Sequence, residues 1–312
     1  MSYHREKIIK DKKYHYLEKN VRTNGKWKKF SIYIGKRNLS KKQIQFLKRK
    51  YSKVLDRRVN SYLKSIDPLL NLLSDRQIKK LEEIKQKYGK DYKKMPPEGK
   101  QRYYEWFITQ FTYNTSAIEG STVTLRETGM ILFDKITPSG KTLHEVREIE
   151  NHKKAFDFIL SYKGDITKNF VLKIHKILTT DILSKENSGK FRKVQVYIRG
   201  VETVPPKPQE VGKEFKKLMN WYKTGKKKYH PVIVASYFHS AFEGIHPFID
   251  FNGRTGRLLL NFILMKNEFP TVDIKNKDRM KYYDALQKAQ KGNLEPFVNL
   301  IVRYIEEIKS FF

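Results

Sequence analysis

One twelve-residue segment constrains the fold of this chain more than any other, and it reads His246-Pro247-Phe248-Ile249-Asp250-Phe251-Asn252-Gly253-Arg254-Thr255-Gly256-Arg257. Pro247 and Asn252-Gly253 oppose regular structure and predict a loop, whereas the apolar run at 257–264 predicts a largely buried helix that starts where the loop ends. Backbone N–H groups and the positive end of the helix dipole would surround such a loop, so it suits an anion. Arg254 and Arg257 lie three residues apart, and we expect them to face that anion together.

In this order the residues resemble the motif of the Fic family, His-Pro-Phe-x-Asp/Glu-Gly-Asn-Gly-Arg-x-x-Arg. Every defining position matches except one, where Phe251 replaces the first glycine of the family. Fic proteins typically move AMP from ATP to a protein hydroxyl. The resemblance implies that His246 is the general base and that Asp250 is a Mg²⁺ ligand. The contacts that it implies to the nucleotide phosphates come from Phe251, Asn252, Gly253, Arg254, Gly256 and Arg257.

The implied reaction makes chemical sense, because a hydroxyl is a poor nucleophile at neutral pH. An imidazole that removes its proton typically contributes about 10²- to 10⁴-fold in rate. Mg²⁺ and backbone amides then stabilise the charge that develops on the α- and β-phosphates as pyrophosphate leaves. The resemblance therefore implies a protein adenylyltransferase with ATP as substrate and Mg²⁺ as cofactor. The alternatives are removal of AMP, transfer of another phosphate-linked group, and a catalytically silenced regulator that binds nucleotide or nucleic acid.

Phe251 is the departure from the family pattern that bears most on activity. Glycine reaches positive φ without steric cost and lets phosphate oxygens approach the backbone amide. If position 251 needs left-handed geometry, phenylalanine costs about 1 kcal/mol or more and its ring crowds the site. If it does not, the ring points outward or stacks near the nucleotide. We expect a ring in a solvent-accessible loop, which can rotate aside.

His239, Glu243 and His246 offer a second interpretation, because spacings of four and three residues place metal ligands on one helical face. Two observations argue against a metal site. Pro247 indicates that the helix ends beside His246, and His239 lies on an apolar stripe of the same helix. The pattern therefore favours a hydrogen-bonded core histidine at position 239.

Upstream of the loop, Thr115-Ser116-Ala117-Ile118-Glu119-Gly120 fits the Ser/Thr-x-x-x-Glu-Gly/Asn inhibitory motif of Fic proteins. The resemblance implies that Glu119 pairs with Arg257, neutralises it and occupies space that the γ-phosphate of ATP needs. A bidentate guanidinium–carboxylate pair is geometrically specific enough to act as a latch. In isolation the same residues would describe a helix-terminal glutamate followed by a C-cap glycine. Together with the loop they predict an autoinhibited enzyme.

The similarity to Fic proteins covers roughly residues 100 to 305. The segment 172–178 resembles a family helix that carries a histidine, although a core position on an amphipathic helix is the favoured interpretation of His175. The turn Gly189-Lys190-Phe191-Arg192 also resembles a family element.

The alternating run at 194–198, followed by Gly200 and by Pro205-Pro206, predicts a β-hairpin. It resembles the flap that Fic proteins carry beside the active site. The unpaired edges of such a ribbon would let a target segment add as a strand. The unknown protein target is therefore predicted to bind at about 194–206, and a hairpin that only covers the core is the alternative.

These patterns predict a mainly α protein, namely a Fic-type helical bundle with a small β-hairpin flap, preceded by a helical region and an N-terminal β-hairpin. The expected divisions are a basic β-hairpin at 1–38, a helical accessory region at 39–98 and a catalytic domain at 99–312 that includes the inhibitory helix. Nothing that resembles a separate C-terminal DNA-reading domain follows the catalytic domain.

Helical elements are predicted along most of the remaining chain. Apolar residues recur at helical spacing from Ser40 to Leu73, and Ser74-Asp75-Arg76-Gln77 matches a capping box that opens a helix through about Tyr88. Pro96-Pro97 mark a break before the next helix. The later helices are expected at about 98–113, 278–291 and 295–309.

The N-terminal hairpin is predicted by Asn24-Gly25, a strong turn signal, between strand-like segments at 14–21 and 26–34. Its surface is basic and aromatic and could stack on nucleic acid. The aromatic residues are Tyr14, Tyr16, Trp27 and Tyr33. A small ribbon docked on the helical body is the favoured interpretation.

The formal net charge of +32 is spread along much of the chain and predicts salt-sensitive association with polyanions. A role in nucleic-acid binding competes with lysine-rich coding in an A/T-rich genome. Lysine greatly outnumbers arginine and no compact recognition motif is present, so the second explanation is favoured. Any association with nucleic acid is expected to be nonspecific.

The chain contains no cysteine, which excludes disulfides and thiol catalysis. No apolar run approaches the length of a membrane span, and the first residues lack the apolar core of a signal peptide. A soluble cytoplasmic protein without membrane association is therefore expected. The sequence does not identify the protein target, the modified side chain or the oligomeric state, and a homodimer is among the assemblies that it allows.

Overall fold

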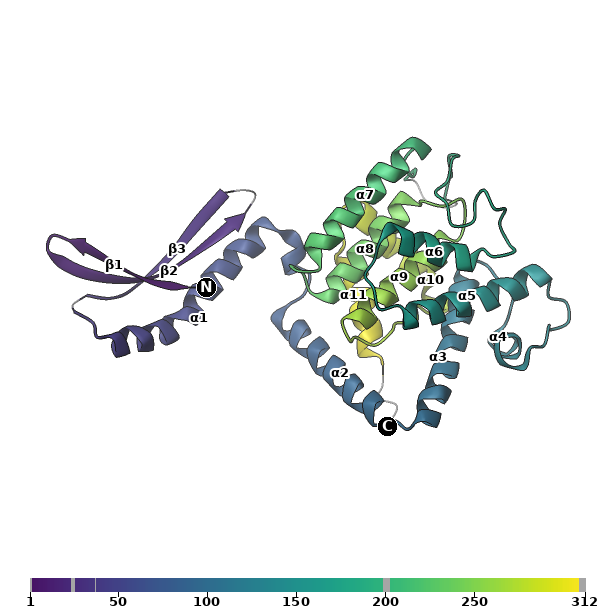
Figure 1. Cartoon of the computed structure of the whole chain (residues 1–312), viewed down its shortest axis with the longest axis horizontal. Helices are drawn as coiled ribbons and strands as arrows, with labels where there is room; N and C mark the ends of the chain where they lie inside the picture. Colours follow the sequence, from purple (N-terminus) through teal and green to yellow (C-terminus); the bar gives the residue numbers. More distant parts are fainter. Residues whose placement is uncertain (1, 24–25, 37, 199–202, 309–312) are drawn as a thin grey trace. The chain divides into compact units, whose positions relative to one another are not determined.

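The computed structural model describes residues 2–23, 26–36, 38–198 and 203–308 (Figure 1). The chain divides into two compact units, Met1–Asn71 and Leu72–Phe312. Within the described residues the strands all lie in the first unit, and helices build the second. The predicted mainly α fold is thus confirmed. No helix in the described ranges is long and apolar enough to cross a membrane.

A three-stranded antiparallel sheet and one long helix form the first unit. The strands are β1 Tyr3–Ile9, β2 Lys12–Thr23 and β3 Lys26–Lys36, in the spatial order β1-β2-β3. Helix α1 Lys41–Ile66 begins with a capping box between Ser40 and Gln43. It packs on one face of the sheet around a core of Leu17, Ile32, Ile34 and Leu55.

The pairing of β2 with β3 confirms the predicted N-terminal hairpin, although its turn residues Asn24 and Gly25 lie outside the described residues. The sequence does not predict β1. This strand joins β2 through Lys10 and Asp11, which both have positive φ (48° and 54°), as a two-residue hairpin turn requires. Such turns usually contain asparagine or glycine, so the Lys-Asp turn carries a weak sequence signal.

Helix α1 ends earlier than the apolar pattern predicts. Asp67 is its C-cap, and Pro68 follows. The residue before a proline avoids the helical region, because the proline ring collides with the preceding backbone. A single 3₁₀ turn, Pro68–Asn71, then closes the first unit.

The helices of the second unit are α2 Asp75–Lys94, α3 Pro97–Ile118, α4 Leu125–Gly129, α5 Leu143–Ser161, α6 Lys168–Leu178, α7 Pro208–Gly225, α8 Pro231–Ile245, α9 Asn252–Lys266, α10 Arg279–Gln290 and α11 Glu295–Glu306. A π turn at Met130–Asp134 and a 3₁₀ turn at Asn276–Asp278 complete the list. The capping box at Ser74 is confirmed. The helices that begin at Asp75 and Pro97 extend beyond their predicted ends, to Lys94 and Ile118.

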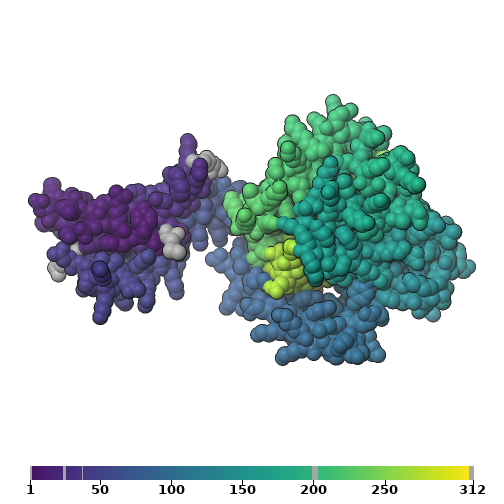
Figure 2. Space-filling model, viewed as in Figure 1, coloured from purple at the N-terminus to yellow at the C-terminus, as the bar shows by residue number. Residues whose placement is uncertain are grey.

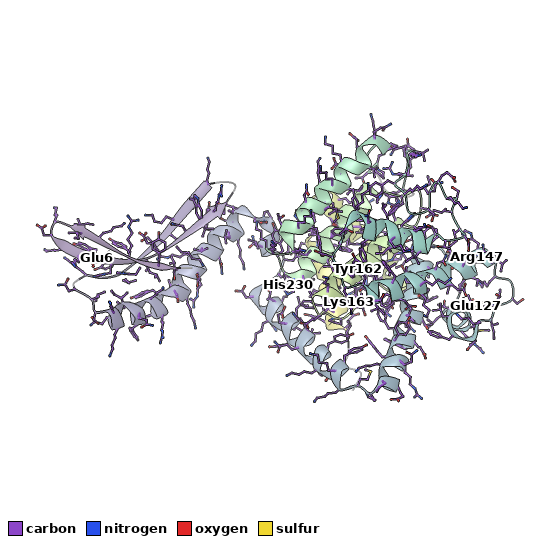
Figure 3. All side chains as sticks on the ribbon, in the orientation of Figure 1. Glu6, Glu127, Arg147, Tyr162, Lys163 and His230 are labelled. Carbon is purple, nitrogen blue, oxygen red and sulfur yellow. The ribbon has the colours of Figure 1, made fainter. Side chains whose placement is uncertain are left out.

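Helix α9 is enclosed by its neighbours, since α3, α5, α6 and α8 all contact it. Its residues from Leu258 to Leu264 are buried on every side. A helix that is apolar all round must be surrounded by protein, so the sequence of α9 itself accounts for this position. Segments of α5, α6 and α7 form much of the visible surface of the unit (Figure 2), and side chains fill the space between the ribbons (Figure 3).

Candidate functional site

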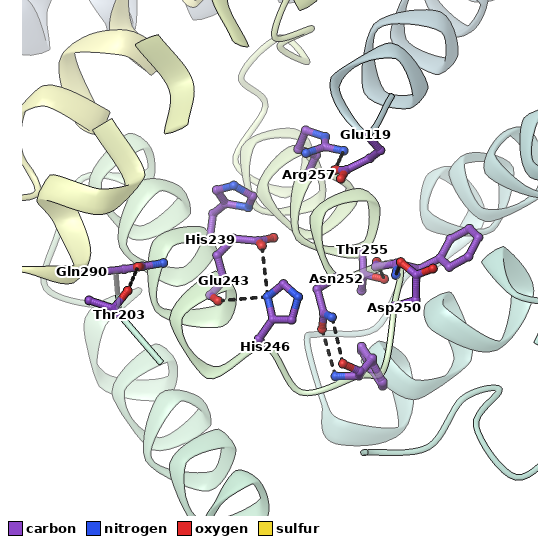
Figure 4. A network of polar contacts seen from close by, with 12 residues as sticks. Glu119, Thr203, His239, Glu243, His246, Asp250, Asn252, Thr255, Arg257 and Gln290 are labelled. Carbon is purple, nitrogen blue, oxygen red and sulfur yellow. Dashed lines mark hydrogen bonds and ion pairs between the residues drawn. The ribbon is translucent and has the colours of Figure 1, made fainter. Parts of the chain in front are cut away.

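His246 lies at the C-terminal end of α8 in left-handed geometry (φ 47°, ψ 62°), and the following proline prevents the helix from continuing. Its Nδ1 lies 3.3 Å from the carbonyl oxygen of Glu243 (Figure 4). Because a carbonyl only accepts, this contact places the imidazole proton on Nδ1 and leaves a lone pair on Nε2. Burial lowers the pKa of His246, although the Glu243 carbonyl opposes this. The side chain is therefore neutral at pH 7, as a general base must be.

The loop before α9 is held by side chains that are fully buried or nearly so. The amide of Asn252 accepts from Phe248 N at 2.9 Å and donates to Phe248 O at 3.0 Å. His175 accepts from the Gly189 N–H at 3.0 Å through Nδ1, so its Nε2 carries the proton and donates to the Asp250 carbonyl at 3.1 Å. The interpretation of His175 as a core residue is confirmed, because it is fully buried and stacks on the Phe248 ring. Any phosphate contact from Asn252 would therefore come from its backbone N–H.

Arg192 fastens the same loop from the other side. Its Nε donates to the His246 carbonyl at 2.8 Å, and its backbone N–H donates to the Pro247 carbonyl at 2.9 Å. A terminal nitrogen of the guanidinium also donates to the Pro206 carbonyl. The segment around 194–206 is thus tied to the loop that carries His246.

The strand predicted over 194–198 is wrong, because these residues are not paired as a strand within the described part of the chain. The predicted turn at Gly200 lies outside the described residues. The two limbs are joined instead through a side chain, since Gln195 Nε2 donates to the Pro205 carbonyl at 3.1 Å. Pro205 and Pro206 have no N–H to donate, so the returning limb cannot supply a regular ladder there.

Phe251 is the N-cap of α9 and has left-handed geometry (φ 61°, ψ 16°). Its side chain is 3% exposed, so the expectation of a solvent-accessible ring that rotates aside is wrong. The Arg254 guanidinium lies 4.3 Å from the centre of the ring, which is the geometry of a cation–π contact. The first α-helical bond of α9 runs from Thr255 N to Phe251 O. The N–H groups of the three residues between them precede the helical ladder, so they have no acceptor within the helix and can donate to an anion.

Arg254 and Arg257 are both buried, but different carboxylates hold them. Arg254 donates to Glu148 Oε2 on α5 at 3.0 Å. Arg257 donates to Glu119 Oε1 at the end of α3 at 2.7 Å. The Nε of Arg254 is buried and has no hydrogen-bond partner among the described residues. Arg254 therefore keeps one guanidinium N–H that is not committed to another residue in the described part of the chain.

Arg257 is the more firmly fixed of the two arginines. Its Nε donates to the Thr115 hydroxyl at 2.6 Å, and a terminal nitrogen donates to the Thr115 carbonyl at 3.1 Å. Its other terminal nitrogen donates to the Tyr282 hydroxyl at 3.3 Å. Burial alone would lower the pKa of Arg257, but Tyr282 and Glu119 outweigh burial and raise it, so the side chain is always charged.

The predicted contact between Glu119 and Arg257 is present (Figure 4), but it consists of one hydrogen bond to Oε1 instead of the predicted bidentate pair. Burial alone would raise the pKa of Glu119, but Arg257 and Arg254 hold it below its ordinary value, so the carboxylate is ionised. Its Oε1 lies so close to Gly253 that a Cβ at that position would collide with it. The glycine in the first turn of α9 therefore lets a carboxylate rest against the helix N-terminus.

His239 and Glu243 do not form a metal site with His246, since no group of three potential ligands gathers anywhere in the described ranges. His239 is fully buried and its Nε2 lies 2.8 Å from the Tyr282 hydroxyl, which confirms a hydrogen-bonded core histidine. Burial raises the pKa of Glu243 to about 8, against the effect of Arg257, so this carboxyl is neutral at pH 7. Gly256 packs directly against both side chains, and a Cβ there would collide with Glu243. The absence of a side chain at Gly256 thus serves helix packing.

Asp250 is exposed, and its Oδ1 accepts the Phe251 N–H at 2.6 Å. Mg²⁺ is usually held by one or two carboxylates together with substrate phosphates and water. A single exposed carboxylate beside a helix N-terminus that can bind phosphate fits that donor set. The chemistry of this residue is therefore compatible with the predicted metal role.

The sequence pattern missed three side chains that organise the site. Thr115 is the first residue of the upstream motif, so the sequence could have pointed to its contact with Arg257. Glu148 and Tyr282 lie on helices α5 and α10 outside any motif, and nothing local distinguishes them from other helical residues. Only the packing of those helices against α9 reveals them.

Residues 165–264 match the sequence pattern of the Fic/DOC family. The chain is 37% identical over 202 residues to the protein adenylyltransferase Fic of Drosophila persimilis, a match that covers 64% of this chain and 39% of that protein. The protein adenylyltransferase Fic of Drosophila ananassae gives the same identity, with 40% of that protein covered. The chain thus spans about two fifths of the length of these curated relatives.

Solved structures of Fic proteins also resemble the fold. Fic-1 from C. elegans is 27% identical with a TM-score of 0.63, and the match covers 82% of this chain and 74% of that chain. A Fic domain-containing signaling protein from Bacteroides thetaiotaomicron is 24% identical with a TM-score of 0.66, and the match covers 72% of this chain and 93% of that chain. The second likeness concerns the fold alone.

Proposed function

We propose that this chain is an autoinhibited protein adenylyltransferase of the Fic type, which moves AMP from ATP to a hydroxyl side chain of a target protein. The proposal starts from the match of residues 165–264 to the Fic/DOC family and from the similarity to the Drosophila relatives. The name of its Drosophila relatives supports the reaction class. The arrangement of His246, the N-terminus of α9 and the two buried arginines supports the same reaction. The contact between Glu119 and Arg257 is the observation that carries the inhibitory part of the proposal.

In the proposed reaction, Nε2 of neutral His246 accepts the proton of the target hydroxyl. The hydroxyl oxygen attacks the α-phosphorus of ATP and forms a new phosphorus–oxygen bond. The bond from the α-phosphorus to its bridging oxygen breaks, and pyrophosphate leaves with that electron pair. Backbone N–H groups at the start of α9 and the positive charge of Arg254 would stabilise the charge that develops on the phosphates.

Asp250 is the residue that would hold Mg²⁺, together with oxygens of the bound nucleotide. The ion would supply positive charge beside the phosphates. The same carboxylate also accepts the Phe251 N–H, so it fixes the geometry of the loop whether or not a metal is bound.

The proposed inhibition is electrostatic and steric. Ionised Glu119 neutralises Arg257 and rests against Gly253, at the place where the end of a triphosphate would approach the helix. A second negative group at that place would be repelled by the carboxylate. Opening requires the Glu119 side chain to leave, because Thr115 and Tyr282 hold Arg257 on its other sides.

The target is proposed to bind at the segment 194–206, which Arg192 ties to the His246 loop. Its apolar side chains are unusually exposed for their type, with Tyr197 at 77% and Val204 at 62%. Exposed apolar residues that cluster beside a site commonly mark a binding surface. A target held there would present its hydroxyl next to Nε2 of His246.

The test is incorporation of label from α-³²P ATP by purified protein in the presence of a broad panel of candidate targets. Glu119→Gly and Glu119→Gln should both raise incorporation, because each removes the charge that opposes the phosphate. Glu105→Gln on the same helix is the matched control and should change nothing. Adding His246→Ala to Glu119→Gly should abolish the signal.

The label also separates the alternatives. Label transferred from γ-³²P ATP but not from α-³²P ATP would indicate transfer of a different phosphate group. Loss of label from a modified target would indicate removal of AMP. No incorporation by any variant, with ATP binding retained, would contradict the proposed enzyme and leave a nucleotide-binding regulator.

A further inference from the structure

The two faces of the N-terminal sheet differ sharply in composition. Leu17, Ile32 and Ile34 point towards α1 and form the core with it. Residues that pair directly across neighbouring strands share a face, and successive residues alternate. The register pairs Tyr16 with Tyr33 and Glu18 with Ser31, so these residues lie on the opposite, helix-free face.

Aromatic rings gather on the helix-free face. Its rings are those of Tyr3, Tyr14, Tyr16, Trp27 and Tyr33. Trp27 is 69% exposed and Tyr33 is 48% exposed, although large aromatic side chains are usually mostly buried. The Tyr16 and Tyr33 rings lie edge to face with centres 5.7 Å apart. The face is therefore an organised aromatic surface and not a set of isolated exposed rings.

Cationic groups are interleaved with these rings. Lys7 lies 4.6 Å from the centre of the Tyr16 ring, and Arg22 pairs across the strands with Trp27. Glu18 contributes an acid to this face, but it is fully buried, and Arg5, Lys7 and Lys29 surround it within 4 Å. Residues 1–71 contain 21 Lys and Arg against five Asp and Glu, which accounts for 16 of the 32 net positive charges of the chain. On the helix-free face itself the register places at least five cations against the one acid Glu18, so its charge is positive; they include Arg5, Lys7, Arg22, Lys29 and Lys36.

We propose that the helix-free face of β1-β2-β3 binds a single strand of nucleic acid. Rings on the face would stack on successive bases, and the interleaved cations would neutralise the phosphates between them. A single strand matches both the aromatic rings and the cations of the face, because it has unstacked bases as well as phosphates. An acidic protein would pair with the cations but has no run of flat bases to stack on the rings. A duplex would offer phosphates, but its bases are already stacked. Figure 3 shows side chains standing out from the side of the sheet away from α1.

This proposal reverses the preference that the sequence alone supports. The composition alone favours coding bias as the explanation for the excess of lysine over arginine, and coding bias would scatter cations without regard to structure. The register shows instead that Lys7, Arg22 and Lys36 each lie over an aromatic ring of the helix-free face, whereas the centre of the other face packs apolar residues on α1. Coding bias does not account for that separation.

The test is fluorescence anisotropy of the full chain with a labelled single strand of about 12 nucleotides of mixed sequence, and with the duplex of the same length. Titrations at about 50 and about 200 mM salt give the salt dependence. The single strand should bind at least tenfold more tightly than the duplex. Trp27→Leu with Tyr33→Leu should weaken single-strand binding at least tenfold and leave the salt dependence unchanged.

Matched controls lie on α1, away from the face. Phe46 is an exposed aromatic residue (66%), and Phe46→Leu should leave binding unchanged. Lys7→Gln with Arg22→Gln should weaken binding and reduce its salt dependence, whereas the same charge loss at exposed Lys41 and Lys42 should have little effect. Circular dichroism would confirm that every variant is folded, and the comparison of single strand with duplex needs no variant.

Three outcomes would overturn the proposal: equal or tighter binding of the duplex, equal weakening by the control variants, or no binding at low salt. None of them bears on AMP transfer by the Glu119 variants, because the face belongs to the N-terminal unit and the proposed active site to the second.

Discussion

Replacement of Phe251 by glycine sets two opposing effects against each other, and the structure decides which is larger. Phenylalanine at φ 61° carries a strain of about 1–2 kcal/mol that glycine would relieve. The ring is also 3% exposed, and truncation of a buried phenylalanine costs about 3–5 kcal/mol. We therefore expect Phe251→Gly to lower the free energy of unfolding by about 2–3 kcal/mol.

Thermal unfolding measures this effect. For a unit of about 240 residues, each kcal/mol shifts Tm by about 2–4 °C, so a decrease of about 4–12 °C is expected. Phe251→Leu keeps most of the apolar burial and should be the mildest change. Phe251→Asn tolerates left-handed geometry but loses the ring, so it should resemble Phe251→Gly. A rise in Tm for Phe251→Gly would refute the reasoning, because strain and not burial would then dominate.

Phe251→Gly also tests whether Phe251 or Glu119 limits AMP incorporation. If the Glu119 contact is the dominant block, Glu119→Gly should raise AMP incorporation and Phe251→Gly alone should change little. If the buried ring is the block, only proteins that carry Phe251→Gly should become active. Wild type, the two single variants and the double variant form a cycle that measures the coupling directly. We expect the Glu119 contact to dominate, since it places a negative charge against the phosphate.

Three further outcomes are expected. His246→Ala in the Glu119→Gly background should abolish AMP transfer while ATP affinity, measured by calorimetry, stays within about twofold, because general-base catalysis contributes about 10²- to 10⁴-fold in rate and not in binding. Asn252→Ala should lower the urea midpoint by the equivalent of about 2–4 kcal/mol, because it leaves the N–H and carbonyl of Phe248 buried without partners, and an unchanged midpoint would contradict this. The free energy of unfolding should also fall as the pH drops below about 6.5, because three buried histidines bind protons there only in the unfolded chain. In the folded chain they bind protons only near pH 3–4, so each histidine costs about 1.4 kcal/mol per pH unit between these values. Burial lowers the pKa of these groups, which are His152, His175 and His239. Denaturant titrations between pH 4 and 7 would show it, and a flat profile would refute it.

The sequence by itself determined the parts of the site that depend on short-range pattern. The loop before α9, its N-terminal position on a buried helix and the end of α8 beside His246 all follow from Pro247, Asn252-Gly253 and the apolar run. The contact between Glu119 and Arg257 was implied by two motifs together. The loop, the start of α9 and the end of α8 rest on residues within a few positions of one another, where backbone preferences and helical spacing act directly. The Glu119–Arg257 contact spans 138 residues and was implied only by the resemblance to a family motif.

The tertiary structure decided what local pattern leaves open. Arg254 and Glu148 are separated by 106 residues and Arg257 and Thr115 by 142, so only the packing of whole helices brings them together. The burial of the Phe251 ring likewise depends on what surrounds the loop, and not on the loop sequence. The gathering of aromatic rings among cations on one face of the N-terminal sheet required the strand register and a strand, β1, that the sequence did not predict. Local chemistry thus specified which groups act, whereas long-range packing set their partners, their burial and their charge.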